Sequence, residues 1–481
     1  MKTVFKKYSV WWIALAVFAI NFILKVSFLD ASSIAWDEPF TIFHAQMEVK
    51  DIVSELYKGN NPPFFEIVLH YWMYFSGLDP FWMRFLSLIF SCVTAVLIFI
   101  LGNRFFNRAI GITTAALFTF ANYHVFFAHE VRVYAWLGMW MVLTMYVFLK
   151  FVHNPTWRTA ILLMILNAIL MYSHYLSFFL LLVQFISVIS IAEIRKKVLG
   201  KSLVIALGVL VLFLPNILVL MNRFQSSASN GTWIKRPDGI VDLYNMLWRF
   251  SNQPVTTVLC LTILVAAGIK IWINRSKVTV SIPTKVTLIW FLFPLLFQFL
   301  ISFKIPMFID RYLIFASVGY YLSVAIAANY IFAKPVFRFA TLALVIALFV
   351  FTVKPNLDNK RHVQEAVSYI QSIEGPETTI LICGFDFALN FSYYYDRGLF
   401  QNAKKENPLD NLIQDLKQKD IHPLYQFEAD MPLKRKVIYL DAAADFSNPG
   451  NGMLDGLNAR YELKNTTHFK EVFNVYEFEL K

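Results

Sequence analysis

The chain has 481 residues, of which 58% are hydrophobic and only 16% are charged, and its mean hydropathy is +0.54. Soluble chains carry roughly 25% charged residues, so this composition excludes a mainly soluble or disordered protein. The apolar residues gather into runs of about twenty, the length that crosses about 30 Å of hydrocarbon. Three cysteines make neither a disulfide framework nor a zinc site. The sequence predicts a polytopic α-helical membrane protein.

Charge is divided unevenly along the chain. Residues 1–354 hold 29 Lys and Arg against 13 Asp and Glu, a net charge of +16. Residues 355–481 hold 14 against 19, a net charge of −5. The basic character therefore belongs to the membrane part, where topology explains it and nucleic acid is not needed as a partner.

Eleven membrane spans are predicted from the apolar runs. They are 10–29, 83–102, 109–128, 133–151, 159–173, 175–193, 202–221, 254–272, 286–303, 312–333 and 336–353. The first is expected to remain as a span, since it is about 20 residues long and has no small-x-small cleavage site. The run is also followed by many others, which favours a multi-pass protein.

The connections between spans predict the orientation in the cytoplasmic membrane. With the N-terminus inside, the inner segments carry 17 Lys and Arg and one acid, Glu193. This is the bias that the positive-inside rule expects, and it places the N-terminus in the cytoplasm. Eleven spans then place the C-terminus outside. The inner segments are 1–9, 103–108, 150–158, 193–201, 270–285 and 334–338.

Two domains are predicted, a transmembrane domain over 1–354 and a small extracytoplasmic α/β domain over 355–481. The outer loops of the first are 30–82 and 222–253, and loop 30–82 includes two stretches, 49–57 and 64–75, that favour interfacial helices. The tail has helical apolar spacing over 363–370, ended by Gly375-Pro376. Its predicted strands are 379–383, 437–441, 461–464 and 471–480.

Several chemically capable clusters lie at span ends on the predicted outer side. Asp37 and Glu38 follow the first span, and two adjacent carboxylates there are either ordinary loop charges or a general base for an acceptor hydroxyl. Glu66 follows the corner Asn61-Pro62-Pro63. Arg84 opens the second span, where a cation either reaches lipid headgroups or holds a substrate phosphate.

Two further clusters stand on the same side. Residues 127–134 bring together His129, Glu130, Arg132 and Tyr134, either as an internally paired cap or as part of a site. His174 lies in a tight turn nearby, where a hydrogen-bonded turn residue is the commoner role.

Arg311 has a guanidinium suited to bidentate phosphate binding, or to pairing with Asp310 or Asp37. The recurrence of such clusters at one membrane depth indicates an outward cavity that suits a polyprenyl-phosphate sugar.

Other chemistries find no support in the sequence. It has no P-loop, no GxGxxG entering a helix from a strand, and no HExxH, CxxC or GxSxG motif. No ligand spacing requires a metal, so no cofactor is expected to be required, although a divalent cation is possible. The spans contain no deep acid of the kind that ion-coupled transporters use.

The ordered set of motifs resembles the integral-membrane glycosyltransferases of the GT-C superfamily. The nearest group is the bacterial family that includes protein O-mannosyltransferases and the lipid A aminoarabinose transferase. The residues that carry the resemblance are Asp37-Glu38, Asn61-Pro62-Pro63-Phe64-Phe65, Arg84-Phe85-Leu86-Ser87, His129 to Ala135, Tyr172 to Tyr175, Arg311-Tyr312 and Tyr393-Tyr394-Tyr395. Family members commonly have His-Pro-Pro where this chain has Asn61-Pro62-Pro63, and Gln-Glu where it has His129-Glu130.

The resemblance implies a catalytic role for Asp37, with Glu38 as the second acid of an Asp-Glu pair. It implies that Arg84 holds the donor phosphate, with Arg132 and Arg311 as helpers. Substrate-binding candidates are Glu66, His129, Glu130, Tyr134 and His174. The expected partners are a polyprenyl-phosphate sugar, a lipid, glycan or protein acceptor, and membrane lipids.

Two other functions compete with the transferase. A transporter or flippase of lipid-linked sugars would show paired repeats and polar residues near mid-membrane, and the sequence has neither. A non-catalytic scaffold with an acidic tail predicts that replacing Asp37 by Asn has no effect. An inverting glycosyltransferase is the prediction that the sequence favours.

Overall fold

The fold is described from a computed structural model of the whole chain. It describes residues 2–58, 62–230, 234–356, 361–384, 387–404, 407–470 and 473–481. Asn61 of the predicted corner lies outside the described residues. The chain forms two compact units. Unit 1 comprises Met1–Phe28, Leu56–Phe65 and Arg84–Leu357, and unit 2 comprises Leu29–Glu55, Glu66–Met83 and Asp358–Lys481.

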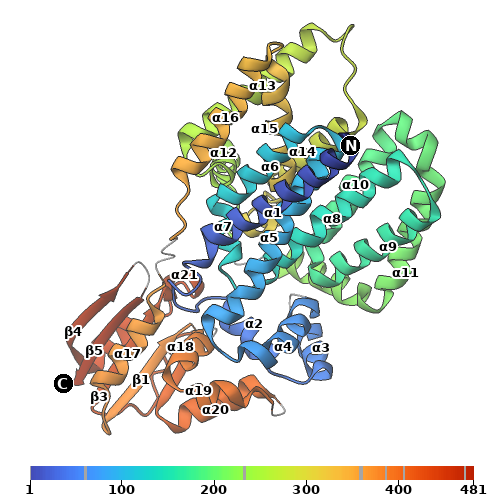
Figure 1. The fold of residues 1–481 in the computed structure, drawn as a ribbon. Helices are drawn as coiled ribbons and strands as arrows, with labels where there is room; N and C mark the ends of the chain where they lie inside the picture. Colours follow the sequence, from blue (N-terminus) through green and yellow to red (C-terminus); the bar gives the residue numbers. More distant parts are fainter. Residues whose placement is uncertain are drawn as a thin grey trace. The chain divides into compact units, whose positions relative to one another are not determined.

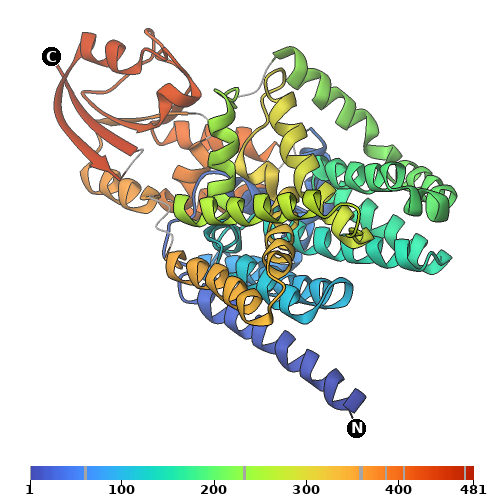
Figure 2. The same cartoon turned by 90° about the horizontal axis from the view of Figure 1, so that it is seen from above.

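Unit 1 is helical (Figure 1). Its long helices are α1 (Lys2–Val26), α5 (Pro80–Phe105), α6 (Arg108–Phe120), α7 (Asn122–Ala128), α8 (Val133–His153), α9 (Trp157–Ser173), α10 (Phe178–Ser190), α11 (Ala192–Asn230), α12 (Ile240–Phe250), α13 (Pro254–Ile273), α14 (Ile282–Ile301), α15 (Ile314–Ile331) and α16 (Pro335–Thr352). Short 3-10 turns, η1 (Tyr175–Ser177) and η2 (Asp310–Leu313), precede α10 and α15. Seen from above, α1 runs along α6 (Figure 2).

The prediction of a multi-pass helical membrane protein is confirmed. Within the described residues, eight helices are long and apolar enough to cross a membrane, and the bent pair of α6 and α7 makes a ninth candidate. The α9 helix and the segment Tyr175–Ser190 are apolar but shorter. Each of the eleven predicted spans coincides with helix, while the number that crosses the membrane stays a prediction.

One predicted connection differs from the structure. Residues 193–201, expected to join two spans, are the beginning of the 39-residue helix α11. The break lies before them, at Ile191, whose extended backbone (φ −96°, ψ 104°) ends α10. Charge density marks where a helix leaves the membrane, but Arg and Lys are good helix formers and do not stop it. The outer segment 222–253 likewise contains the end of α11 and all of α12.

The break between α6 and α7 has its own polar bridge. Ala121 is extended there, and the two helices meet at 64°. Asn252 closes the gap, because its Nδ2 donates to the carbonyl of Phe120 at 2.8 Å and its Oδ1 accepts from the N–H of Asn122 at 2.7 Å. A broken helix inside an apolar unit needs such partners for its freed backbone groups.

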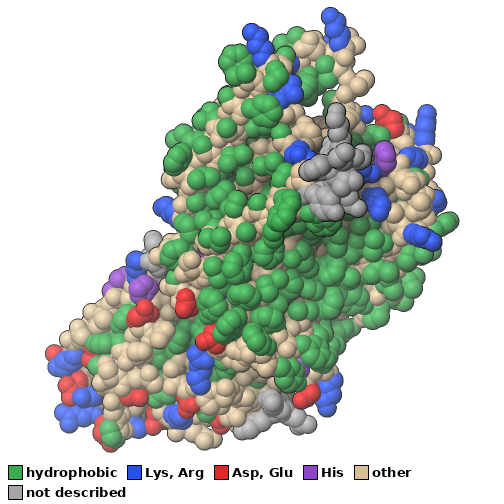
Figure 3. Space-filling model, viewed as in Figure 1, with side chains coloured by type: hydrophobic (Ala, Val, Ile, Leu, Met, Phe, Trp, Pro, Cys, Tyr) green, Lys and Arg blue, Asp and Glu red, His purple; other side chains and the backbone are tan. Residues whose placement is uncertain are grey.

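Side chains on unit 1 follow the pattern expected in lipid. A continuous flank is covered by hydrophobic side chains, and Lys and Arg gather mainly at its upper end in this view (Figure 3). The most buried spans are α15 and α8, whereas α1 and α16 each bury only 17% of their span. Gly102 and Gly111 let α5 and α6 approach closely, since a Cβ on Gly102 would lie 2.5 Å from the Cα of Gly111.

Unit 2 combines the predicted first outer loop with the C-terminal segment. From the loop come α2 (Glu38–Ala45) and most of α3 (Val49–Lys58) and α4 (Phe64–Ser76), which confirm the two predicted helices. The C-terminal elements are α17 (Val363–Ile373), β1 (Thr378–Cys383), α18 (Ala388–Tyr395), α19 (Arg397–Phe400), η4 (Gln401–Lys404), α20 (Pro408–Gln418), β2 (Ile421–Leu424), β3 (Lys436–Ala442), α21 (Ala444–Ser447), α22 (Met453–Arg460), β4 (Tyr461–Phe469) and β5 (Phe473–Leu480).

These strands form one five-stranded sheet in the order β2-β1-β3-β5-β4. β1 lies parallel to β2 and β3, and β5 lies antiparallel to β3 and β4. One face buries Leu381, Tyr439 and Phe478 against α22, and α17 covers the other (Figure 1). The predicted α/β fold of this segment is confirmed, and its sheet has a parallel edge strand, β2, that the sequence did not predict.

Candidate active site

Asp37 stands at the N-terminus of α2 in unit 2. It occupies the N-cap position, is half-buried, and its carbonyl accepts from the N–H of Thr41. The residue before it, Trp36, has φ +57°, a left-handed conformation that costs a non-glycine residue about 1–3 kcal/mol. Such a conformation persists only where surrounding contacts enforce it, so the contacts of Trp36 fix the approach to Asp37.

The C-terminal segment supplies those contacts. The Trp36 ring stacks on Phe473 at 5.8 Å and meets Phe387 edge-on at 6.3 Å, measured between ring centroids. The carbonyl of Trp36 accepts from Nδ2 of Asn390 at 3.1 Å. Two residues earlier, the N–H of Ile34 donates to the hydroxyl of Tyr394. Residues more than 350 positions away therefore hold the turn that presents Asp37.

Glu38 is engaged differently from its neighbour. It is 1% exposed, and its Oε2 lies 3.2 Å from Nη1 of Arg361, which is itself 6% exposed. The same carboxylate oxygen accepts from the N–H of Ala35 at 3.3 Å. A buried carboxylate needs this kind of partner, because an uncompensated charge in a low dielectric is very costly. The pair ties the beginning of α2 to the segment that leads into α17.

Glu66, the third candidate acid, lies in the first turn of α4. It is 3% exposed and accepts from Oγ1 of Thr41 at 3.3 Å. Thr41 belongs to α2, one turn beyond Asp37. All three candidate acids of unit 2 are thus linked through α2. Asp37 and Glu38 stand at its beginning, and Glu66 bonds to Thr41 within it.

Arg84 and Glu130 belong to unit 1, where a hydrogen bond joins their segments. Arg84 is fully buried near the start of α5. One turn later, Oγ of Ser87 donates to the carbonyl of Glu130 at 2.6 Å. Glu130 is 6% exposed and lies in the bend between α7 and α8. This bond fixes the non-helical segment 129–132 against α5.

His129 fixes the same bend against α1. Its Nε2 lies 2.8 Å from the carbonyl of Lys25, so Nε2 is the donor in this bond. The side chain of Lys25 is fully buried, and its Nζ donates to Oγ of Ser91 on α5 at 2.9 Å. The imidazole of His129 therefore anchors the bend to the backbone of α1.

The turn at His174 collects the remaining candidates of unit 1. Nδ1 of His174 accepts from the N–H of Leu176 at 3.1 Å, and the ring lies 6.4 Å from that of Tyr134 and 5.9 Å from that of Tyr312. Burial, followed by the positive charges of Arg132 and Arg311, lowers the pKa of His174 to about 3. The structure thus brings Arg132, Tyr134 and Arg311 together around the neutral imidazole of His174.

The acid beside Arg311 has another partner. Oδ2 of Asp310 forms an ion pair with Nη1 of Arg249 at 2.9 Å, and its Oδ1 accepts from the backbone N–H of Arg311 at 2.8 Å. The carbonyl of Asp310 accepts from the hydroxyl of Tyr123. Asp310 therefore orients the backbone of Arg311, while its ion pair is made with Arg249 from α12.

Sequence reasoning missed Arg361 and Arg249, the cations that hold Glu38 and Asp310. Both lie far along the chain from their partners and in no motif, so only the fold identifies them. Tyr394 belongs to the triple tyrosine that the sequence did single out. Among the described residues, no group of three or more His, Cys, Asp and Glu is arranged to hold a metal ion.

Comparison with known proteins supports the resemblance. Residues 60–219 match the family of dolichyl-phosphate-mannose-protein mannosyltransferases. The matched stretch includes Glu66, Arg84, His129 to Tyr134 and His174, whereas Asp37, Glu38 and Arg311 lie outside it. A search of curated proteins finds no match by sequence.

Solved structures extend the likeness to the whole chain. ArnT from Cupriavidus metallidurans bound to undecaprenyl phosphate matches 98% of this chain and 97% of its own, with a TM-score of 0.59 and 11% identity. The chain has a GT-C fold. An oligosaccharyltransferase from Archaeoglobus fulgidus, in complex with zinc and sulfate, shares the GT-C fold over 97% of this chain and 73% of its own. Its TM-score is 0.53 and its identity 12%.

Proposed function

We propose that this chain is a membrane glycosyltransferase that moves a sugar from a polyprenyl-phosphate donor to an outer-leaflet lipid, glycan or protein. The observation that carries the proposal is the clustering of Arg132 and Arg311 around neutral His174 within a GT-C fold. Two guanidinium groups that act on the same imidazole, one from the start of α8 and one from η2, suit a phosphate monoester or diester. Support for the donor class comes from the ArnT structure with undecaprenyl phosphate.

The proposed reaction is one direct displacement. Asp37 accepts the proton of an acceptor hydroxyl or amine, whose oxygen or nitrogen then forms a bond to the anomeric carbon of the sugar. The bond from that carbon to the phosphate oxygen breaks, and polyprenyl phosphate leaves with the electron pair. Arg84, Arg132 and Arg311 stabilise the charge that grows on the phosphate. A single displacement inverts the anomeric configuration.

The other candidate residues have supporting parts in this proposal. Glu38, neutralised by Arg361, keeps the first turn of α2 in place and so positions Asp37. Glu66 does the same through Thr41. Tyr134 and His174 offer a phenol and an imidazole N–H for the sugar hydroxyls, and His129 and Glu130 hold the bend that carries Arg132. No step is assigned to a metal ion, and a divalent cation remains optional.

An assay of the leaving group separates a transferase from a flippase. The full chain in detergent is given a polyprenyl-phosphate sugar labelled in the lipid, with and without a membrane extract as the source of acceptors. The proposal expects free polyprenyl phosphate to appear only when the extract is present. Since a flippase moves its substrate intact, an unchanged donor under both conditions, with a panel of sugars, would contradict the proposal.

A further inference from the structure

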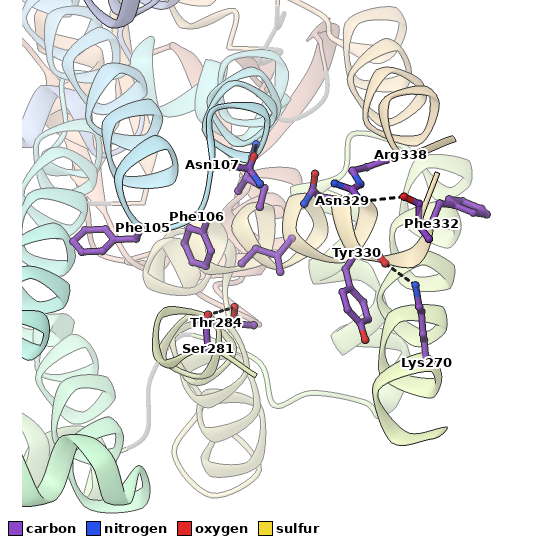
Figure 4. A pocket seen from close by; sticks show the side chains of 13 residues that line it. Phe105, Phe106, Asn107, Lys270, Ser281, Thr284, Asn329, Tyr330, Phe332 and Arg338 are labelled. Carbon is purple, nitrogen blue, oxygen red and sulfur yellow. Dashed lines mark hydrogen bonds between the residues drawn. The ribbon is translucent and has the colours of Figure 1, made fainter. Parts of the chain in front are cut away.

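A cavity lies in unit 1, far along the helices from the bend at His129. It has a volume of about 530 Å³ and is lined by residues from six helices and their connections (Figure 4). The lining comes from the end of α5, the start of α6, the end of α13, the start of α14, the end of α15 and the start of α16. None of these residues takes part in the proposed transfer.

The cavity is positively charged. Lys270 and Arg338 line it, and none of the described lining residues is acidic. Both cations are held by backbone carbonyls: Nζ of Lys270 donates to Tyr330 and Ile331 at 3.0 and 2.9 Å, and Nη2 of Arg338 donates to Ala333 at 3.2 Å (Figure 4). Carbonyl oxygens orient a cation without cancelling its charge, so the positive potential of the cavity persists.

Helix ends of both kinds meet at this cavity. Asn107 caps α6, Ser281 caps α14, and Arg338 stands in the first turn of α16. The N-terminus of a helix carries a partial positive charge of about half a unit. The C-termini of α5, α13 and α15 carry about the same amount of negative charge, so the helix ends cancel and the two cations make the cavity favour an anion. Buried Nε of Arg338 has no hydrogen-bond partner in the structure, which leaves a donor available.

Aromatic side chains border the same cavity. Phe105, Phe106, Tyr330 and Phe332 line it beside the cations. Aromatic rings beside Lys and Arg are typical of the level where lipid headgroups meet acyl chains. Many of the residues that line the cavity belong to the segments 103–108, 270–285 and 334–338, which the charge distribution assigns to the cytoplasmic side. From the two cations, the unpartnered Nε of Arg338 and the aromatic border we infer that this cavity binds an anionic, phosphate-bearing headgroup at the cytoplasmic membrane surface.

This site is separate from the transfer reaction, and its test does not depend on activity. Three probes separate an anionic lipid from a zwitterionic one and from a soluble phosphate: phosphatidylglycerol, phosphatidylcholine and glycerol 3-phosphate. The purified full chain is examined by native mass spectrometry for retained lipid, and by thermal unfolding for glycerol 3-phosphate. The wild type is expected to retain phosphatidylglycerol in preference to phosphatidylcholine, or to be stabilised by glycerol 3-phosphate if the natural ligand is soluble.

Arg338 provides the deciding variants. R338Q removes a charged donor to phosphate and should weaken binding roughly 10- to 100-fold, as charge-assisted hydrogen bonds are worth about 1.5–3 kcal/mol. R338K keeps the charge and should recover most of the binding, which excludes misfolding as the cause. K277Q removes an exposed cation between α13 and α14 that does not line the cavity, and should bind like the wild type. Equal binding of every probe by R338Q and K277Q would overturn the inference.

Discussion

The candidate acids and the candidate cations are held by different kinds of contact. In unit 2, residues of the C-terminal segment hold the start of α2: Arg361 pairs with Glu38, and Phe473 stacks on Trp36, next to Asp37. In unit 1, the cations stand at helix ends fixed by other spans, as Ser87 fixes the carbonyl of Glu130. One unit depends on a folded sheet domain, and the other on helix packing in the membrane.

The difference assigns a role to the C-terminal domain. The C-terminal domain supports Trp36 through Phe473 and pairs Glu38 with Arg361, so it holds the turn that presents Asp37. Substitutions in the C-terminal domain should therefore lower the rate of catalysis by displacing Asp37. Substitutions among the spans should instead weaken binding of the donor.

The largest effect is expected at the buried pair of unit 2. Arg361→Met leaves the carboxylate of Glu38 buried without its cation, and should lower the stability by about 3–5 kcal/mol. The double variant R361M/E38Q should recover much of this loss, because no uncompensated charge remains. Thermal unfolding and limited proteolysis of the purified protein measure both.

The matched control is Arg435→Met. Its pair with Glu479 has the same separation of 3.2 Å, but Arg435 is 71% exposed. Exposed pairs contribute about 0–1 kcal/mol, so R435M should unfold almost like the wild type. Equal losses in R361M and R435M would show that burial does not set the strength of the Glu38 contact.

A smaller effect is expected in unit 1 from Ser87→Ala. This variant removes a buried donor to the carbonyl of Glu130 and should cost about 1–3 kcal/mol. It should also raise the KM for the donor more than it lowers kcat, because it loosens the bend that carries Arg132. Ser187→Ala is the control, since Ser187 is buried and its Oγ donates to a carbonyl of its own helix, at Val183. A similar KM in both variants would contradict the role given to the bend.

The pH dependence of unfolding should identify His174. Its pKa of about 3 lies below the ordinary value of 6.5, so the folded chain binds fewer protons there than the unfolded chain. The stability associated with neutral His174 is present above pH 6.5 and is lost as the pH falls from 6.5 toward 3. The slope of the unfolding free energy against pH reports how many protons are taken up on unfolding. Between pH 7.5 and 5, this slope should be smaller in H174Q than in the wild type, by an amount that approaches about one proton. An unchanged slope in H174Q would mean that this imidazole titrates normally.

The smallest effect is expected from chelation. Arg361 neutralises Glu38, so the adjacent acids do not present the two uncompensated charges that attract a divalent cation. Treating the purified protein with EDTA should therefore change the rate of sugar transfer less than about twofold, within ordinary assay scatter. A loss of activity with EDTA that added Mg²⁺ or Mn²⁺ restores would place a metal ion in the reaction.

Much of unit 1 could be predicted from the sequence, because spans and their basic connections are local properties. The position of Arg132 at the start of α8 and of His174 in a turn followed from apolar runs and their ends. The supports of Asp37 could not be predicted in this way. Arg361, Asn390 and Phe473 reach α2 only once the sheet has formed, and no spacing in the sequence records contacts over more than 320 positions.

The central claim is that Asp37 activates the acceptor in a sugar transfer. The most direct test compares the wild type, Asp37→Asn and Asp30→Asn in detergent, with radiolabelled polyprenyl-phosphate sugars and a membrane extract. Asp30 is an exposed acid of the same segment and serves as the matched control. The account predicts label transfer by the wild type and D30N, and its loss in folded D37N. Equal transfer by all three proteins would remove Asp37 from the chemistry.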